Sequence, residues 1–312
     1  MFEQLGLIGC GLMGGSFALA LKRAGLVKRV VGYSKSPSTT ERARLMGVID
    51  VEAPSALLAV SGADIVLLAV PVSATEATFK AIRHLITANT LVMDVGSTKR
   101  DVVDAARRVL RDNIGSFVPA HPITGKEVSG VEHADADLYT GKQVILTPIE
   151  RTFTAQLNKA ASVWSALGCH VVQMSPQAHD AAYAAVSHLP HLIAFSLINS
   201  ITAQPHGADY MSLAGPGFRD FTRIAASDPK MWRDVMIANR EELLAQSKMF
   251  QQTLQHLEKL ILSSDGDALE KLIEQASQKR ATWRISTPKP IDRKSTRLNS
   301  SHRNTSRMPS SA

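Results

Sequence analysis

Three glycines near the start of the chain have the spacing that binds a dinucleotide. Residues 9–14 (GCGLMG) directly follow an apolar run and lead into a helical pattern. Gly9 permits a tight turn, Gly11 lets the backbone approach a pyrophosphate, and Gly14 lets the helix pack closely on the strand. The helix start also offers free N–H groups and partial positive charge to the phosphates. The pattern predicts a nicotinamide-dinucleotide site; the alternative is a glycine-rich turn without a ligand.

The end of the second predicted strand bears on the choice of cofactor. An Asp or Glu that accepts hydrogen bonds from the adenosine ribose of NAD is usual here, but this chain has Ser34. With Lys35 and nearby Arg42, Ser34 can receive the 2′-phosphate of NADP without carboxylate repulsion, which favours NADP slightly over NAD. Alternatively, both cations are solvated surface charges. The predicted cofactor-binding residues are Gly9, Gly11, Leu12, Met13, Gly14, Ser34 and Lys35.

Three further segments place polar groups where a predicted strand or helix ends. They are residues 94–99 (DVGSTK), 121–127 (HPITGKE) and 218–225 (FRDFTRIA). In doubly wound folds, ligands bind beyond the carboxyl ends of the strands, so chemistry is expected at the first two. By residue type alone, His121 can merely cap a strand, and Ser97 can be the N-cap of a helix.

A group of histidines lies farther along the chain. His179, His188 and His191 occur there, with Asp180 beside the first. Their spacing matches no recognised zinc pattern, Pro190 is expected to interrupt the helix, and hydride transfer to a nicotinamide needs no metal. The sequence therefore predicts no metal site.

Short apolar runs alternate with helical patterns through the first half of the chain. Runs such as 63–70 (ADIVLLAV) and 90–95 (TLVMDV) are typical of buried parallel strands. Other strands are predicted at 5–8, 29–33, 116–120, 143–147 and 170–174, and helices at 16–22, 40–46, 74–85, 100–110 and 154–167. The pattern predicts an α/β domain of the doubly wound Rossmann type over residues 1–174.

After residue 174 the strand signals stop, and stretches rich in Ala, Leu, Gln, Glu and Lys take over. The second domain, residues 175–290, is predicted to be all-helical. Its long helices are expected to leave apolar faces that one chain cannot cover, which favours a homodimer over a monomeric helical cap. The apolar stretch 189–201 contains Pro190 and is judged too short to cross a bilayer, so no membrane span is predicted.

The net charge of +7 over 312 residues is concentrated at one end. Residues 292–312 carry a net +4, which leaves +3 elsewhere, so nucleic-acid binding is not expected. The Ser-rich, basic tail 291–312 is predicted to be disordered and resembles translated vector sequence, so we interpret it as non-native. Cys10 and Cys169 lack disulfide or metal spacing, and no secretory signal is recognised, so the cytoplasm is the expected compartment.

Five segments, in order, resemble the prephenate dehydrogenase family, which includes the cyclohexadienyl and arogenate dehydrogenases of tyrosine biosynthesis. They are the glycine loop, Asp-x-Gly-Ser-x-Lys, His-Pro-Ile-x-Gly, Ser-His-Leu-Pro-His at 187–191 and Phe-Arg-Asp-x-Thr-Arg-Ile-Ala, and the resemblance spans residues 1 to about 285. It implies an enzyme that oxidatively decarboxylates prephenate to 4-hydroxyphenylpyruvate, or arogenate to tyrosine, with hydride transfer to NAD or NADP.

The resemblance also implies roles for individual residues. His121 accepts or polarises the hydroxyl proton, and such general-base help is worth roughly 10² to 10⁴ in rate. Ser97 orients the hydroxyl or the imidazole, and Arg223 binds a substrate carboxylate. The other residues implied to bind substrate or shape the active site are His179, His191, Arg219 and Ser187. For Arg219, a surface ion pair with Asp220 is an equal alternative.

Two other functions are compatible with the fold. Some 2- and 3-hydroxyacid dehydrogenases join a similar glycine loop to a helical domain, but they use a catalytic Lys in a glycine-rich helix, and no such run occurs here. A non-catalytic nicotinamide-sensing module would keep the fold without the chemistry. The presence of His121, Ser97 and Arg223 argues against it.

Overall fold

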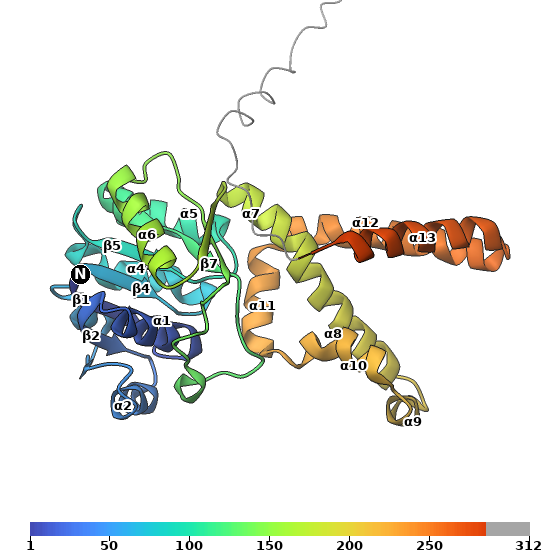
Figure 1. The fold of residues 1–312 in the computed structure, drawn as a ribbon, viewed down its shortest axis with the longest axis horizontal. Coiled ribbons are helices and arrows are strands. Elements are labelled where there is room, and N and C mark those ends of the chain that lie inside the picture. Colours follow the sequence, from blue (N-terminus) through green and yellow to red (C-terminus); the bar gives the residue numbers. More distant parts are fainter. Residues whose placement is uncertain (285–312) are drawn as a thin grey trace, which may run out of the picture.

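The structure, a computed structural model, describes residues 1–284, which form an α/β part followed by a helical part (Figure 1). This arrangement confirms the predicted fold class. The tail prediction for residues 291–312 lies outside the described residues.

A six-stranded parallel sheet forms the centre of the α/β part, in the order β3-β2-β1-β4-β5-β6. The order reverses between β1 and β4, which is where a Rossmann-type sheet binds its dinucleotide. The strands are β1 (Phe2–Ile8), β2 (Val27–Tyr33), β3 (Val51–Glu52), β4 (Ile65–Leu68), β5 (Leu91–Asp94) and β6 (Phe117–Val118).

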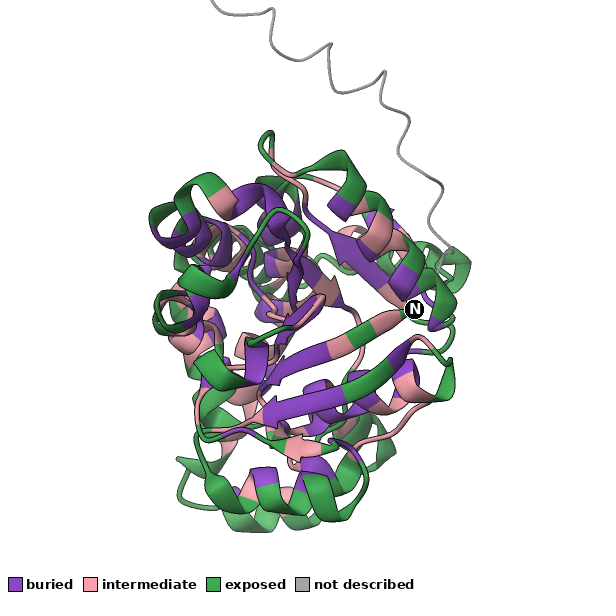
Figure 2. Cartoon of the chain, turned by 90° about the vertical axis from the view of Figure 1, so that its left-hand side faces the viewer, coloured by how far each residue is buried: buried purple, intermediate pink, exposed green. Residues whose placement is uncertain are grey.

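Helices cover both faces of this sheet, which explains why β4, at its centre, is apolar at every position. In β4, Ile65 and Leu67 pack into one core and Val66 and Leu68 into the other, as the two-residue period of a strand requires. Figure 2 shows the strands largely buried. The helices are α1 (Leu12–Arg23), α2 (Pro37–Leu45), α3 (Ala56–Val60), α4 (Thr75–Ile82), α5 (Arg100–Leu110) and α6 (Thr154–Ala166), with 3₁₀ turns at Val72–Ala74, Arg83–Leu85, Arg111–Ser116 and Val131–His133.

A second, three-stranded sheet carries part of the candidate site. It contains β7 (Ala120–Pro122), β8 (Gln143–Leu146) and β9 (His170–Gln173), with β7 antiparallel to β8. The prediction of one strand over 116–120 was therefore wrong. Pro119 has no N–H to donate to a ladder, and the chain passes there from β6 in the first sheet to β7 in the second.

Two short elements, β3 and α3, were not predicted, because two and five residues are too few to show a period.

The helical part begins with one long, continuous helical segment, Pro176–Thr202. It consists of α7 (Pro176–Tyr183), a π-helical turn (Ala184–His188) and α8 (Leu189–Thr202). The expectation that Pro190 interrupts this helix was wrong: Pro190 lies in the first turn of α8, just after the π-helical turn, where a missing N–H is tolerated.

The same segment also corrects the expectation that no apolar stretch is long enough to cross a membrane. Its 27 residues suffice by length and composition, and only 17% of its most apolar window is buried in this chain. Length and composition alone do not distinguish a membrane helix from a helix that a partner protein covers.

The remaining helices are α9 (Gly207–Ser212), α10 (Pro216–Thr222), a 3₁₀ turn at Arg223–Ala226, α11 (Pro229–Ala238), α12 (Arg240–Leu262) and α13 (Gly266–Thr282). The hairpin of α12 and α13 projects away from the α/β part (Figure 1). Large apolar side chains on these elements are exposed, among them Leu213, Leu244 and Leu262.

Candidate active site

The glycine loop at the end of β1 fits a dinucleotide. Gly9 has a φ of +97°, and an added Cβ there would lie 2.1 Å from the Ala69 carbonyl oxygen. An added Cβ at Gly14 would lie 2.0 Å from the Gly9 carbonyl oxygen. At Gly11, an added Cβ would meet nothing within 4 Å in the described chain, and no side chain there caps α1. The first two glycines are required by packing, whereas Gly11 leaves the helix start open to a phosphate.

Ser34 closes the loop from the side of β2. Its Oγ accepts a hydrogen bond from the Cys10 N–H at 2.8 Å, which joins the end of β2 to the glycine loop. The Lys35 side chain is exposed. Arg42 Nη1 lies 3.9 Å from Glu132 Oε2, within the distance of an ion pair. The end of β2 therefore presents a hydroxyl and a cation with no adjacent carboxylate on its own strand.

His121 is the middle residue of β7, and a buried ion pair fixes the strand from behind. Lys99 pairs with Asp94, and both side chains are almost completely buried. Asp94 Oδ1 accepts the Ala120 N–H at 3.0 Å, while Lys99 Nζ donates to the Ala120 carbonyl at 2.8 Å. Both backbone polar groups of the residue before His121 are therefore held by this ion pair.

The His121 ring continues into a second histidine and a carboxylate. His121 Nδ1 lies 2.8 Å from His179 Nε2, and His179 Nδ1 lies 2.7 Å from Asp180 Oδ1. Burial is the main reason that the pKa of His121 lies well below its ordinary value, and it lowers the pKa of His179 to about 2. His121 is thus neutral at physiological pH, the form that can accept a proton.

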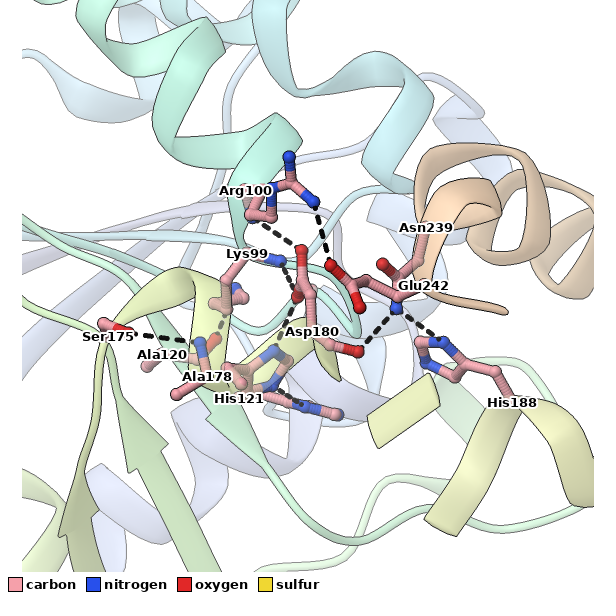
Figure 3. Close-up of polar contacts among 12 residues, drawn as sticks. Lys99, Arg100, Ala120, His121, Ser175, Ala178, Asp180, His188, Asn239 and Glu242 are labelled. Carbon is pink, nitrogen blue, oxygen red and sulfur yellow. Dashed lines mark hydrogen bonds and ion pairs between the residues drawn. The ribbon is translucent and has the colours of Figure 1, made fainter. Parts of the chain in front are cut away.

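Asp180 joins the start of α5 to the helical part (Figure 3). Its two carboxylate oxygens accept the backbone N–H groups of Lys99 and Arg100, each at 2.9 Å. Its carbonyl accepts a hydrogen bond from Asn239 Nδ2 at 2.8 Å, and that amide lies 3.1 Å from His188 Nδ1. These contacts place Asp180 among structural hydrogen bonds, and the described residues contain no group of three or more metal-type ligands.

His179 was predicted to bind substrate or to shape the site, and the structure favours the second role. The side chain is completely buried, and both ring nitrogens are engaged by protein groups. Neither nitrogen remains for a substrate.

His191 and Ser187 lie one turn apart around the π-helical turn. His191 Nδ1 donates to the Ser187 carbonyl at 2.9 Å, which leaves Nε2 as the acceptor of the neutral ring. The ring stacks on Trp232 with centroids 3.5 Å apart, and Trp232 is buried. The structure does not bring His191 into contact with His121.

Arg223 reaches the loop that follows His121, but Arg219 does not. Arg223, at the end of α10, forms an ion pair with Glu127, and both side chains are about half exposed. Arg219 is 75% exposed and pairs only with its neighbour Asp220, at 3.1 Å, among the described residues. In this structure Arg219 projects from α10 into solvent as part of a surface ion pair, which is the alternative that the sequence left open for it.

Ser97 lies on the loop between β5 and α5. That helix begins at Arg100 with Lys99 as its N-cap, so Ser97 is not the cap. Its side chain is partly buried, and within residues 1–284 no protein group hydrogen-bonds its hydroxyl, including His121. The structure places Ser97 next to the Asp94–Lys99 pair without joining it to the histidine.

The sequence analysis missed the site roles of Asp94, Lys99, Asp180 and Glu127. A signal was present for each, since Asp94 and Lys99 end a segment at a strand terminus, Glu127 ends the His121 segment, and Asp180 follows His179.

A Rossmann-type sheet, an open glycine loop and a neutral, partly buried histidine at the junction with a helical part define a nicotinamide-dependent dehydrogenase. Residues 17–173 match the nucleotide-binding domain of prephenate dehydrogenase, and residues 175–275 match its dimerization domain. The chain belongs to the prephenate dehydrogenase family, which confirms the resemblance found in the sequence.

Similar proteins support this assignment. The chain is 34% identical over 286 residues to prephenate dehydrogenase of Bacillus subtilis, covering 90% of this chain and 76% of that protein. It is 34% identical over 284 residues to cyclohexadienyl dehydrogenase of Zymomonas mobilis, covering 90% and 96%. Prephenate dehydrogenase of Aquifex aeolicus, solved with hydroxyphenyl propionate and NAD⁺, superposes with a TM-score of 0.84 at 36% identity, covering 90% of this chain and 98% of that chain.

Proposed function

We propose that this chain oxidatively decarboxylates prephenate to 4-hydroxyphenylpyruvate, arogenate to tyrosine, or both, in tyrosine biosynthesis, and transfers a hydride to NAD(P). The observation that carries the proposal is the neutral, partly buried His121, held in β7 by the buried ion pair behind it, in a member of this family. Relatives named for prephenate and cyclohexadienyl substrates support it.

In the proposed reaction, His121 Nε2 takes the proton of the substrate hydroxyl. A nicotinamide held at the glycine loop would supply the hydride acceptor, and the carbon that bears this hydroxyl becomes a carbonyl as it loses the hydride. The bond from the ring to its carboxylate then breaks, CO₂ leaves, and the electron pair makes the ring aromatic. The phenolic oxygen recovers the proton from His121, so the histidine ends the cycle neutral.

Three further residues are proposed to position the substrate. Arg223 binds a substrate carboxylate in place of Glu127, since a planar guanidinium holds a carboxylate through two charge-assisted hydrogen bonds. Ser97 orients the substrate hydroxyl, which is supported by its partly buried place on the loop that follows β5. His191 presents Nε2 toward the substrate from α8, with Ser187 holding its ring.

We further propose NADP as the preferred cofactor. Ser34 keeps a hydroxyl hydrogen to donate while its oxygen accepts from Cys10, and Lys35 adds positive charge. A Ser34→Asp variant is expected to shift the ratio of kcat/KM values toward NAD, because the new carboxylate would repel the 2′-phosphate and accept from the ribose hydroxyl.

A homodimer in the cytoplasm is the proposed assembly. The match to a dimerization domain and the exposed apolar side chains of the helical part support it. A second copy of the chain over the Pro176–Thr202 helix would also account for that helix being apolar and little buried in one chain.

The experiment that tests the function is nicotinamide reduction by the purified chain with prephenate or arogenate, each with NAD or NADP. Turnover in any of the four combinations supports the proposal, and the kcat/KM ratios assign the substrate and the cofactor. Bound cofactor without turnover in all four would favour another hydroxyacid substrate or a nicotinamide-sensing role.

A further inference from the structure

Two protein groups continue the hydrogen-bond chain behind the proposed base. His121, His179 and Asp180 are linked in series at 2.8 and 2.7 Å, from β7 into α7. The first ring is partly exposed, whereas the other two side chains are buried. This series of hydrogen bonds therefore runs from the partly exposed ring of His121 to a carboxylate that substrate cannot reach.

The partners of the carboxylate determine where the hydrogens lie. Both oxygens of Asp180 accept backbone N–H groups, from Lys99 and Arg100. A carboxylate oxygen that already accepts can only accept again from a ring nitrogen, so His179 carries its hydrogen on Nδ1. The neutral His179 ring then offers Nε2 as an acceptor.

The same logic fixes His121. Since His179 Nε2 accepts, His121 must donate through Nδ1. The other nitrogen, Nε2, is then the one with a free lone pair, and no protein group in residues 1–284 hydrogen-bonds to it.

Asp180 itself has little freedom to move. It belongs to α7, and its carboxylate lies at the start of α5, where the helix terminus favours a negative charge, while Asn239 holds its carbonyl. Figure 3 shows Asp180 between Lys99 and Arg100 on one side and Asn239 on the other. The site is thus built to hold a carboxylate in one orientation.

We propose that Asp180 and His179 are positioning residues that hold His121 in the one tautomer whose Nε2 can accept the substrate proton. This inference rests on the proposed function of His121. When His121 takes up the proton, Nδ1 keeps its hydrogen bond to His179, so the ring does not have to reorient during the reaction.

The decisive comparison is His179→Gln with His179→Leu. A Gln side chain can place an oxygen where Nε2 lies and accept from His121 Nδ1, which keeps the base in its active tautomer. Leu removes the acceptor, so nothing holds the His121 hydrogen on Nδ1. We expect kcat of His179→Leu to fall by roughly 10² to 10⁴, the usual range for general-base help, and kcat of His179→Gln to stay within about tenfold of wild type, while KM and cofactor affinity change less than threefold in both.

A spectroscopic readout separates positioning from a merely structural role. In ¹⁵N-histidine spectra of the cofactor-free protein, wild-type His121 and His179 should both be protonated at Nδ1. His179→Gln should keep His121 protonated at Nδ1, and His179→Leu should not. The matched control is Glu242→Gln, which alters the neighbouring contact to Arg100 at 3.3 Å without touching the chain, and should leave both tautomers and kcat unchanged.

Equal kcat of the two variants, or wild-type kcat with His121 protonated at Nδ1 in a folded His179→Leu, would overturn the proposal. If His179→Leu does not fold, the wild-type spectra still decide, because a His121 protonated at Nε2 would overturn the proposal. Absence of wild-type turnover would instead contradict the proposed function, and the tautomer spectra would still test the chain.

Discussion

Two ion pairs lie on either side of His121, and they differ in how far their charges are buried. Behind the histidine, Lys99 and Asp94 are fully desolvated and share their partners with the backbone of β7. Beyond it, Arg223 and Glu127 meet at the surface, each about half exposed. The first region can hold only one arrangement, because separating its charges would leave one of them buried and unpaired.

The exposed pair can exchange partners at low cost, since solvent screens its charges. The contrast indicates a division of labour: the buried region orients the base, and the exposed arginine exchanges its own carboxylate for that of the substrate. The predictions below test that division, beginning with the largest expected effect.

The His121→Asn substitution should remove the base and keep the shape of β7. We expect kcat to fall by roughly 10² to 10⁴, the usual value of general-base help, with NAD(P) affinity unchanged because the glycine loop is untouched. Steady-state kinetics and cofactor titration measure the two quantities. Unchanged kcat would defeat the proposed mechanism and leave the fold assignment standing.

Breaking the buried pair should mainly affect stability. Lys99→Met leaves Asp94 buried without its cation, which should cost about 3 to 5 kcal/mol in the free energy of unfolding. The matched control is Lys80→Met, which removes a surface pair with Glu76 at 2.8 Å and should cost less than about 1 kcal/mol. Denaturant titration compares the two variants. Equal losses in the free energy of unfolding would show that the buried pair stabilises the fold no more than the surface pair does.

The exposed arginine should act on substrate affinity. Arg223→Lys keeps the charge but loses the bidentate geometry, so we expect KM to rise roughly 10- to 100-fold with a smaller change in kcat. Arg219→Lys, four residues earlier and paired only with Asp220 among the described residues, should change KM by less than about threefold. A comparable effect of both variants would place Arg219 in the site after all.

The buried histidines should make stability depend on pH. Burial lowers the pKa of His188 to about 4 and that of His179 to about 2, from 6.5. Below pH 6.5 the unfolded chain therefore binds more protons than the folded one, and the free energy of unfolding should fall as the pH is lowered from 7 to 5. Denaturant titrations at both values measure the slope. His188→Asn should show a smaller slope, and an equal slope would contradict the assignment.

The sequence predicted those parts of the fold that depend on local pattern. The buried strands could be recognised as apolar runs because helices cover both faces of the sheet. The spacing of the glycines indicated the tight turn that Gly9 adopts. The break at Pro119 was missed because it depends on the change from one sheet to the other. The continuous helix through Pro190 was missed because it depends on a π-helical turn. Neither is encoded in a periodic pattern.

The candidate site was predictable only as separate pieces. His121 and Arg223 were identified from their segments, but their partners lie 58 and 96 residues away, respectively. The role of Asp180 follows from the backbone N–H groups of α5, which no side-chain motif reports. Arg219 matched the same motif as Arg223, yet one helical turn directs it into solvent.

The pH dependence of kcat/KM with the preferred substrate and cofactor tests the central claim most directly, because it reports the charge of the base in the free enzyme. A neutral His121 with a pKa below its ordinary 6.5 predicts a constant kcat/KM near neutrality and a decline only below about pH 6.5. That decline should be absent from the residual activity of His121→Asn. A decline that begins above pH 7, or one that persists unchanged in His121→Asn, would contradict the account.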